Sequence, residues 1–271
     1  MQNMFKKERQ REILKLIDAR GKAQVDELAR RLRVSGMTVR RDLLELHRQG
    51  LLERVRGGAL LHRDDHLRVE PPVLEREREN AEGKRAIGEY VARLIRDGEK
   101  IFLGSGSTTA AVAEALLHHQ NLTVLTNALN IAYILAASPG ISVTVTGGFL
   151  RRSELSLIGH FAERTLQGLQ VDKVIIGMRG IDPVKGLTSD NMDELITDQA
   201  ILGVSRNIVV VADHSKFGYV AAIRTAPVTA ATTIITDGGG PKDVLEAIRK
   251  MGVHVIEIDR VVSRSPNRGH A

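Results

Sequence analysis

Seven short runs of apolar, mostly β-branched residues lie between residues 100 and 259, separated by stretches in which apolar residues recur at helical spacing. The runs are apolar almost throughout, which is typical of strands that are covered on both faces of a sheet. Helices predicted at about 108–117, 129–137, 191–205 and 241–251 supply that cover. The pattern therefore predicts an α/β domain with a largely parallel sheet, which binds ligands at the carboxyl ends of its strands. The seven runs are KIFLG, LTVLTN, SVTVTGG, DKVIIGM, NIVVVAD, TTIITD and VHVIEID.

The first part of the chain has a different pattern, with three short amphipathic helices. Residues 8–19 carry one apolar stripe, and residues 25–32 place apolar side chains at i, i+3, i+4 and i+7. After a tight break, residues 36–49 repeat this spacing, and Ser35 is placed to cap the third helix by accepting from an amide near Thr38. Two short helices joined by a tight turn are the layout of a helix-turn-helix, in which the second helix enters the major groove of DNA.

A β-hairpin is expected directly after the third helix. The run LLERVRGGALLH consists of two alternating apolar segments around Arg54, Arg56, Gly57 and Gly58, which indicates a hairpin wing. An arginine beside two glycines suits a close approach to a DNA backbone. The N-terminal segment is therefore predicted to be a winged helix-turn-helix.

The net charge of the chain is concentrated in this segment. Residues 1–63 hold 16 basic and 8 acidic residues, a formal charge of +8, whereas the remainder carries −2. A basic module on a nearly neutral body indicates a polyanionic partner. Aromatic residues make up 3% and tryptophan is absent, so a duplex is favoured over a single strand that would need stacking. The alternative is a structural helical bundle with a basic surface.

DNA contacts are expected from the third helix and the wing. Arginines in the first turns of a recognition helix donate to guanine or phosphate, and a threonine can bind phosphate or contact a thymine methyl group. The predicted DNA-binding residues are Ser35, Met37, Thr38, Arg40, Arg41, Arg54, Arg56 and Gly57.

Residues suited to phosphate binding follow five of the predicted strands. After KIFL, a run rich in glycine, serine and threonine leads into a helix, where backbone amides and hydroxyls can donate to an anion. The run matches neither the G-x-x-x-x-G-K-[ST] nor the G-x-G-x-x-G motif, which makes nucleoside triphosphates and dinucleotides less favoured ligands. Each position alone could instead serve a turn or the surface. The predicted site for one anionic, hydroxyl-rich ligand comprises Gly104, Ser105, Gly106, Ser107, Thr108, Thr109, Asn127, Gly147, Gly148, Arg151, Arg179 and Lys216.

The run VSGMTVRRDLLELHRQGLLERVRGGALL resembles the signature of the DeoR family of bacterial transcriptional regulators, and the resemblance covers about residues 5–260. It implies a winged helix-turn-helix followed by a sugar-phosphate-sensing domain whose fold resembles the pentose-phosphate isomerases. The runs GSGSTT, TNALNIA, VTGGFLRR, GIDPVKGLTS and VVVADHSKFG correspond to the loops of that sensor. Two positions depart from the family: a longer side chain is expected at Gly36, and many members have Asp at Gly104. Because that Asp would contact sugar hydroxyls, the identity of the ligand stays open.

The similarity to isomerases makes an isomerase-like enzyme fused to a DNA-binding head the alternative function. Such an enzyme needs a carboxylate base over the sugar and a cation near the developing oxyanion. Where the isomerase motif supplies two acids, this chain reads Gly177-Met178-Arg179-Gly180, and an arginine cannot remove a proton. Asp182, Asp190 and Glu194 remain nearby, although Asp182 before Pro183 suits a turn. Binding without catalysis is therefore predicted, with no metal site and no cofactor.

The predicted organisation has four segments: a winged helix-turn-helix at 1–61, a charged, proline-containing linker at 62–74, a sensor domain at 75–260 and a disordered tail at 261–271. One helix is expected over residues 75–96, with a solvated, charged start.

The partners follow from this organisation. We expect a DNA-binding regulator that represses a carbohydrate-utilisation operon and is released by a phosphorylated sugar. Two-fold operators match dimers, so a homodimer or a larger even assembly is expected. Cysteine is absent, and neither a membrane-spanning run nor a signal peptide is evident, which favours a cytoplasmic protein without membrane contact.

Overall fold

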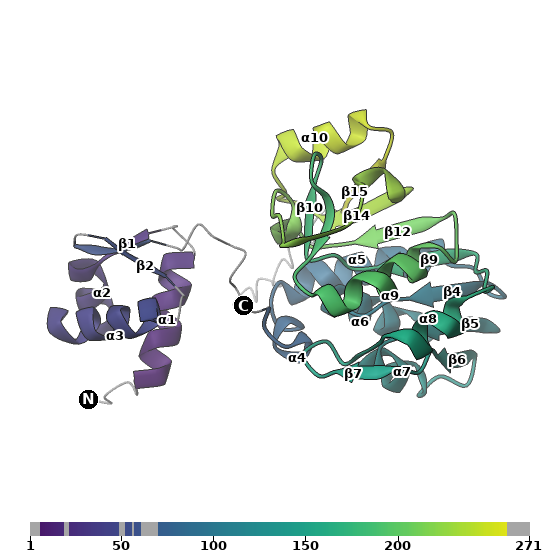
Figure 1. Ribbon diagram of the computed structural model, residues 1–271, viewed down its shortest axis with the longest axis horizontal. Helices are drawn as coiled ribbons and strands as arrows, with labels where there is room; N and C mark the ends of the chain where they lie inside the picture. The colour runs from purple at the N-terminus through teal and green to yellow at the C-terminus, as the bar shows by residue number, and fades with distance from the viewer. Residues whose placement is uncertain (1–5, 19–21, 49–51, 56, 61–69, 259–271) are drawn as a thin grey trace, which may run out of the picture. The chain divides into compact units, whose positions relative to one another are not determined.

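A computed structural model describes residues 6–18, 22–48, 52–55, 57–60 and 70–258 of the chain (Figure 1). The chain divides into two compact units, residues 1–69 and 70–271. Arg56, most of the predicted linker and the predicted disordered tail lie outside the described residues. Residues 70–74 of the predicted linker belong to the second unit, where the Val73 amide donates to the Ser153 carbonyl at 2.7 Å. None of the described helices is long and apolar enough to cross a membrane.

The first unit combines three helices with a three-stranded antiparallel sheet. The helices are α1 (Lys6–Asp18), α2 (Val25–Leu32) and α3 (Gly36–Arg48), and the strands β1 (Lys22–Gln24), β2 (Glu53–Val55) and β3 (Gly58–Leu60) pair in the order β1-β3-β2. Ser35 Oγ accepts from the Thr38 amide at 3.2 Å, which confirms the predicted cap of α3. The predicted winged helix-turn-helix is confirmed. Its core consists of Ile13, Ile17, Ala23, Val25, Leu28, Leu32, Val39, Leu43, Leu46, Leu52 and Ala59.

An ion pair fixes α1 to α3. Arg9 Nε donates to Asp42 Oδ2 at 2.5 Å, and the Asp42 carboxylate is buried. The hydrogen bond to Asp42 raises the pKa of Arg9. A carboxylate buried among apolar side chains needs such a partner, so the pair orients the recognition helix on the rest of the unit.

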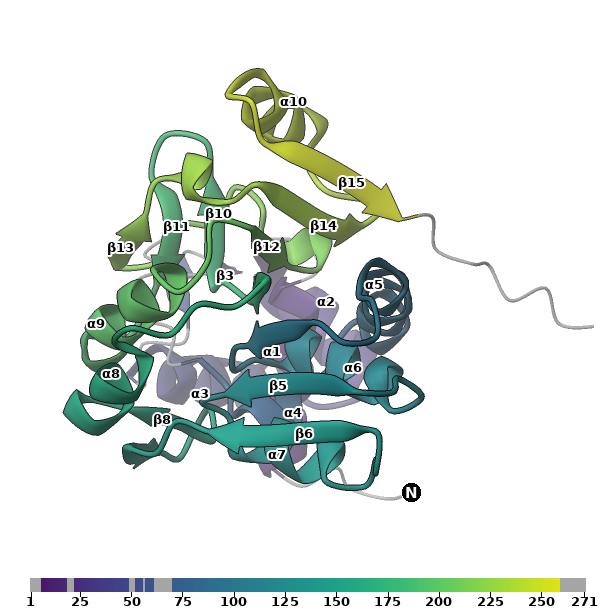
Figure 2. The same ribbon diagram turned by 90° about the vertical axis from the view of Figure 1, so that its right-hand side faces the viewer.

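The second unit is built on a seven-stranded parallel sheet, in the order β15-β14-β12-β9-β4-β5-β6. Figure 2 shows β15 and β14 at one end of this sheet and β5 and β6 at the other. All seven predicted runs form its strands, which confirms the predicted fold class. The strand order reverses between β4 and β9, since the chain builds outward from β4 to β6 and then returns to the other side of β4. The strands are β4 (Lys100–Leu103), β5 (Leu122–Thr126), β6 (Ile141–Val145), β9 (Lys173–Ile176), β12 (Ile208–Val211), β14 (Thr233–Asp237) and β15 (His254–Ile258).

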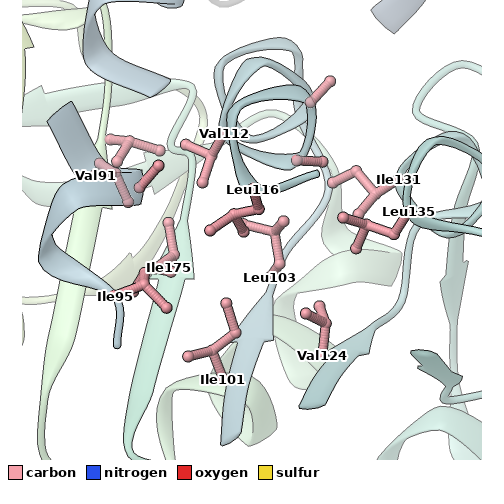
Figure 3. Packing of buried hydrophobic residues seen from close by; sticks show 14 of the residues in the cluster. Val91, Ile95, Ile101, Leu103, Val112, Leu116, Val124, Ile131, Leu135 and Ile175 are labelled. Atoms are coloured by element: carbon pink, nitrogen blue, oxygen red, sulfur yellow. The ribbon is translucent and has the colours of Figure 1, made fainter. Parts of the chain in front are cut away.

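Helices cover both faces of this sheet, because alternate strand residues point to opposite sides. Ile101 and Leu103 belong to a core with α5 (Ala81–Leu94), α6 (Ser107–Leu116) and α7 (Leu129–Leu135), and Figure 3 shows Leu103 beside Leu116 of α6. Phe102 belongs to the opposite core, with α8 (His160–Leu166), α9 (Met192–Leu202) and α10 (Lys242–Lys250). The central strands are therefore buried on both faces, which explains their continuous apolar runs.

Two smaller antiparallel sheets and two 3-10 turns lie outside the patterns read from the sequence. Strands β10 (Gly180–Asp182), β11 (Gly186–Ser189) and β13 (Ile223–Ala226) form one sheet, and β7 (Phe149–Arg151) pairs with β8 (Ser156–Ile158). The 3-10 turns are η2 (His214–Lys216) and η3 (Val228–Ala230). Their segments are too short for a hydrophobic period to identify.

The single helix predicted over residues 75–96 is wrong. The chain forms α4 (Val73–Arg76) and then α5, and Asn80 between them adopts a left-handed conformation with φ of 50°. Asparagine tolerates this conformation better than most residues, so it can interrupt a helical pattern without a glycine or proline. The break turns Arg76 into the interior, where it is buried instead of forming part of a solvated start.

Candidate functional site

The predicted DNA-binding side chains lie on the open face of α3 and on the wing. Val39 and Leu43 anchor α3 in the core, whereas Arg40 and Arg41 are exposed and Met37 is 74% exposed. Neither arginine forms an ion pair with another described residue. Both guanidinium groups are therefore available to an anionic partner.

The remaining predicted DNA contacts are only partly described. The Thr38 hydroxyl lies 2.9 Å from Ser35 Oγ at the start of α3, and Arg54 is exposed on β2. Gly57 has φ of 86° in the turn between β2 and β3, a conformation that glycine adopts without a steric penalty. Arg56 beside it lies outside the described residues.

In the second unit a cleft opens at the carboxyl ends of β4, β9 and β12. These strands flank the point at which the strand order reverses, which is where ligands bind in open α/β sheets. Its lining residues are Glu70, Arg76, Ser105, Gly106, Ser107, Thr108, Glu154, Gly177, Met178, Arg179, Ser189, Glu194, Asp198, Val211, Ala212 and Lys216.

One wall of the cleft is the loop between β4 and α6. Gly106 is the N-cap of α6 with φ of 134°, and it has no side chain with which to cap the helix. The first amides of an α-helix have no intrahelical acceptor, and the helix dipole favours an anion at this end. The Ser107 and Thr108 hydroxyls stand beside those amides. The loop can therefore donate several hydrogen bonds to a phosphate.

Two cations from neighbouring strand ends line the same cleft. Lys216 lies in η2, and burial lowers the pKa of its ammonium group. This ammonium group forms no hydrogen bond or ion pair with another described residue. Arg179 instead donates to Asp190 at 2.9 Å and lies over the Tyr219 ring at 4.8 Å. Lys216 is thus the cation that a bound anion would neutralise first.

Half of the predicted ligand residues do not line the cleft. Gly104 packs against β9, where an added Cβ would lie 3.1 Å from Ile176 Cγ1. The Thr109 hydroxyl donates to the Gly106 carbonyl, and the buried Asn127 lies close to Leu157. Gly104, Thr109 and Asn127 therefore support the loops around the cleft. The residues outside the lining are Gly104, Thr109, Asn127, Gly147, Gly148 and Arg151.

The cleft is also lined by four carboxylates that the sequence does not assign to the ligand site: Glu70, Glu154, Glu194 and Asp198. Arg76 binds both Glu70, at 2.9 Å, and Glu154. Arg151 binds Glu194 at 2.5 Å. Only Glu194 is marked by the sequence, as an acid near the isomerase motif. The other three do not directly follow any of the strands that the sequence predicts, so no motif or period marks them.

Crowding of these acids shifts their protonation. Burial, opposed by Arg76 and reinforced by the Glu70 carboxylate, raises the pKa of Glu154 to about 7. Burial and the neighbouring Glu194 carboxylate raise the pKa of Asp198 well above its ordinary value. Both acids therefore favour their protonated forms more than a carboxyl group in water does.

Replacing Arg76 with methionine is expected to destabilise the second unit by about 3–5 kcal/mol, because two buried carboxylates would lose their shared partner. Urea denaturation followed by circular dichroism measures the effect. Arg78→Met is the matched control, since Arg78 is exposed two residues away. Equal midpoints for the two variants would show that the buried pairs contribute nothing to stability.

The raised pKa of Glu154 predicts a pH dependence of stability. The folded protein holds a proton that the unfolded chain releases above its ordinary pKa of 4.5, so stability falls as the pH rises from about 4.5 to 7. The loss is about 1.4 kcal/mol for each unit by which folding raises the pKa. Glu154→Gln should flatten this part of the curve of unfolding free energy against pH. An unchanged slope in the variant would assign the dependence to other groups.

Comparison with known proteins agrees with this two-part organisation. The DeoR-like helix-turn-helix domain family matches residues 9–64, and the DeoR C terminal sensor domain family matches residues 79–238. The glycerol-3-phosphate regulon repressor of Escherichia coli is 34% identical over 90% of this chain and 96% of that protein. The HTH-type transcriptional repressor CsqR of the same species is 35% identical over 90% of this chain and 93% of its own length.

A similarity to a solved structure concerns only part of the chain. Ribose 5-phosphate isomerase A from Methanocaldococcus jannaschii aligns with 51% of this chain and 55% of its own, at 16% identity and a TM-score of 0.39.

Proposed function

This chain belongs to the DeoR family of transcriptional regulators, and from that premise we propose that it represses a carbohydrate-utilisation operon until a phosphorylated sugar releases it from the operator. The relatives named above are repressors and not enzymes, which confirms the prediction of a regulator. A repressor acts on the chromosome, and we place the protein in the cytoplasm for that reason.

The observation that carries the sensor assignment is the pairing of an uncapped helix with an unpartnered lysine. The phosphate lies at the N-terminus of α6, accepts from the amides and hydroxyls of Ser107 and Thr108, and faces the Lys216 ammonium group. The sugar hydroxyls extend toward Arg179 and the carboxylates of the cleft. Gly104, Thr109 and Asn127 hold the loops in place behind this contact layer.

The head binds duplex DNA through the first turns of α3. Arg40 and Arg41 contact base edges or phosphates in the major groove, and Thr38 contacts the backbone at the start of the helix. In the wing, Arg54 and the turn at Gly57 contact the phosphate backbone of the DNA. The exposure of these side chains and the +8 charge of residues 1–63 support this arrangement.

Control of the operator is a linkage between two binding sites. The sugar phosphate binds more tightly to the arrangement of subunits that has low affinity for DNA. Its binding therefore weakens the free energy of DNA binding by the coupling free energy, typically ~1–3 kcal/mol. A homodimer or a larger even assembly supplies the two heads that a two-fold operator requires.

The isomerase alternative loses its acid–base groups in the motif region. The Asp182 carboxylate accepts from the Val184 and Lys185 amides at 2.8 and 2.7 Å, which assigns it to a turn. Asp190 is bound by Arg179. Neither carboxylate is free to act as the base that an aldose–ketose isomerisation needs.

A thermal-shift screen of sugar phosphates on the full chain tests the proposal. Phosphorylated sugars should raise the melting temperature, whereas the same sugars without phosphate should leave it unchanged. Light scattering on the same samples measures the oligomeric state. A shift with the unphosphorylated sugars alone, or no shift with any sugar phosphate, would contradict the phosphate site.

A further inference from the structure

The charged side chains of the cleft divide into paired and unpaired groups. Seven charged residues line it, and five of them form ion pairs with each other or with adjacent residues. The side chains of Lys216 and Asp198 form no hydrogen bond or ion pair with any described residue, and they do not pair with each other. The five paired residues are Glu70, Arg76, Glu154, Arg179 and Glu194. The cleft therefore holds one basic and one acidic side chain that have no partner among the described residues.

The two unpaired charges lie on different elements. Lys216 stands after β12, in the cleft that also holds the phosphate-binding loop at α6. Asp198 lies on α9, one helical turn after Glu194. The cation that acts on this pair of acids is Arg151, and its guanidinium group is already bound to Glu194 at 2.5 Å. Asp198 is thus the acid of the cleft whose carboxyl group has no cationic partner among the described residues.

We propose that the ligand is a phosphorylated amino sugar, whose phosphate binds Lys216 and the α6 loop and whose ammonium group binds Asp198. This inference rests on the proposed function, which places a sugar phosphate in the cleft, and adds the chemical class of the sugar. Sequence motifs point to the phosphate half alone, because Asp198 belongs to no loop that follows a strand.

Charge balance favours an ammonium group over a hydroxyl at Asp198. A hydroxyl can donate one hydrogen bond to the Asp198 carboxylate, but it supplies no positive charge. An ammonium group donates hydrogen bonds and also acts as a counter-ion, and hydrogen bonds between ionised groups are roughly twice as strong as neutral ones. Burial and the Glu194 carboxylate raise the pKa of Asp198, and a bound ammonium group would favour its ionised form.

Isothermal titration calorimetry on the full chain separates the two ligand classes. Matched pairs differ at one position of the sugar: glucosamine 6-phosphate against glucose 6-phosphate, and galactosamine 6-phosphate against galactose 6-phosphate. In at least one pair the amino sugar should bind about 10- to 100-fold more tightly, the range of a hydrogen bond to a charged group. N-acetylglucosamine 6-phosphate, which has no charge at nitrogen, should bind no more tightly than glucose 6-phosphate.

A variant at Asp198 connects the preference to this side chain. Asp198→Asn keeps the shape of the carboxylate and removes its charge, so it should abolish the preference: the amino sugar phosphate and its neutral partner should then bind with equal affinity. Asp193→Asn is the matched control, because Asp193 is exposed on the same helix. Its preference should equal that of the unmodified chain.

The outcomes separate this inference from the proposed function. Equal or tighter binding of the neutral partner in both pairs would overturn the amino-sugar inference and leave a sugar-phosphate sensor. An amino-sugar preference that survives in Asp198→Asn would overturn the assignment to Asp198. Failure of all four sugar phosphates, together with a thermal-shift screen without a hit, would contradict the proposed function itself.

Discussion

Replacing Arg40 and Arg41 together with alanine is expected to abolish specific binding of operator DNA. Both guanidinium groups project from the first turns of α3, are exposed and have no acidic partner among the described residues. A good arginine contact to a base contributes about 1–3 kcal/mol of discrimination, and a two-fold complex loses every contact twice. The loss for the pair is therefore on the order of 100-fold or more in affinity. Fluorescence anisotropy with a labelled promoter fragment, at a fixed salt concentration, measures it.

The control for this variant removes two positive charges elsewhere on the same unit. Arg11 and Lys15 are exposed on α1, away from the turn that begins α3. The double replacement Arg11→Ala plus Lys15→Ala should weaken binding only modestly, through the lower net charge. The melting shift caused by a sugar phosphate should persist in both double variants. Normal DNA binding by Arg40→Ala plus Arg41→Ala would mean that α3 is not the recognition helix.

Reversing the charge of Lys216 is expected to abolish effector binding. Two unit charges 4 Å apart interact by about 4 kcal/mol at an effective dielectric constant of 20, so Lys216→Glu exchanges attraction to the phosphate for repulsion. The affinity of Lys216→Glu for the sugar phosphate should be lower than that of the unmodified chain by more than about a thousandfold. The affinity of Lys216→Met should lie between these two values. DNA binding should remain and should no longer respond to the sugar. Calorimetry and anisotropy measure the two effects separately.

The matched control is Lys185→Glu. Lys185 is exposed in the turn between β10 and β11 and does not line the cleft, and its replacement changes the net charge by the same amount. Lys185→Glu should bind the effector with the affinity of the unmodified chain, and the effector should release it from operator DNA to the same extent. Loss of effector binding in both lysine variants would point to overall charge, and retention in both would remove Lys216 from the phosphate site.

The sheet could be predicted from the sequence because its strands are buried on both faces. Runs such as those at β9 and β12 are apolar at every position, and a parallel α/β sheet is the arrangement that buries such strands. The strand ends follow from the same pattern, which predicts that the Gly- and Ser-rich loop and Lys216 lie at one edge of the sheet. Ser35 was identified as a cap because capping depends on a local hydrogen bond.

The acidic half of the cleft could not be predicted, because it depends on tertiary contacts. Arg76 reads as part of a solvated helix, yet the left-handed turn at Asn80 directs the chain so that it meets Glu154, 78 residues later. Asp198 lies on a helix whose polar positions look like an ordinary exposed face. Neither a hydrophobic period nor a strand end marks such residues. Conversely, Gly104 and Asn127 follow strands, where ligand-binding residues are expected. In the structure they support the loops instead, because Gly104 packs against Ile176 and Asn127 contacts Leu157.

The affinity for promoter DNA, measured with and without a saturating sugar phosphate, tests the central claim most directly. The effector should weaken DNA binding by about 5- to 150-fold, and linkage requires that DNA weaken effector binding by the same factor. Nuclear magnetic resonance of the sugar phosphate in the same sample should show it unchanged. Equal affinity for DNA at both effector concentrations, or rapid conversion of the sugar phosphate to an isomer, would contradict a repressor that senses its ligand without consuming it.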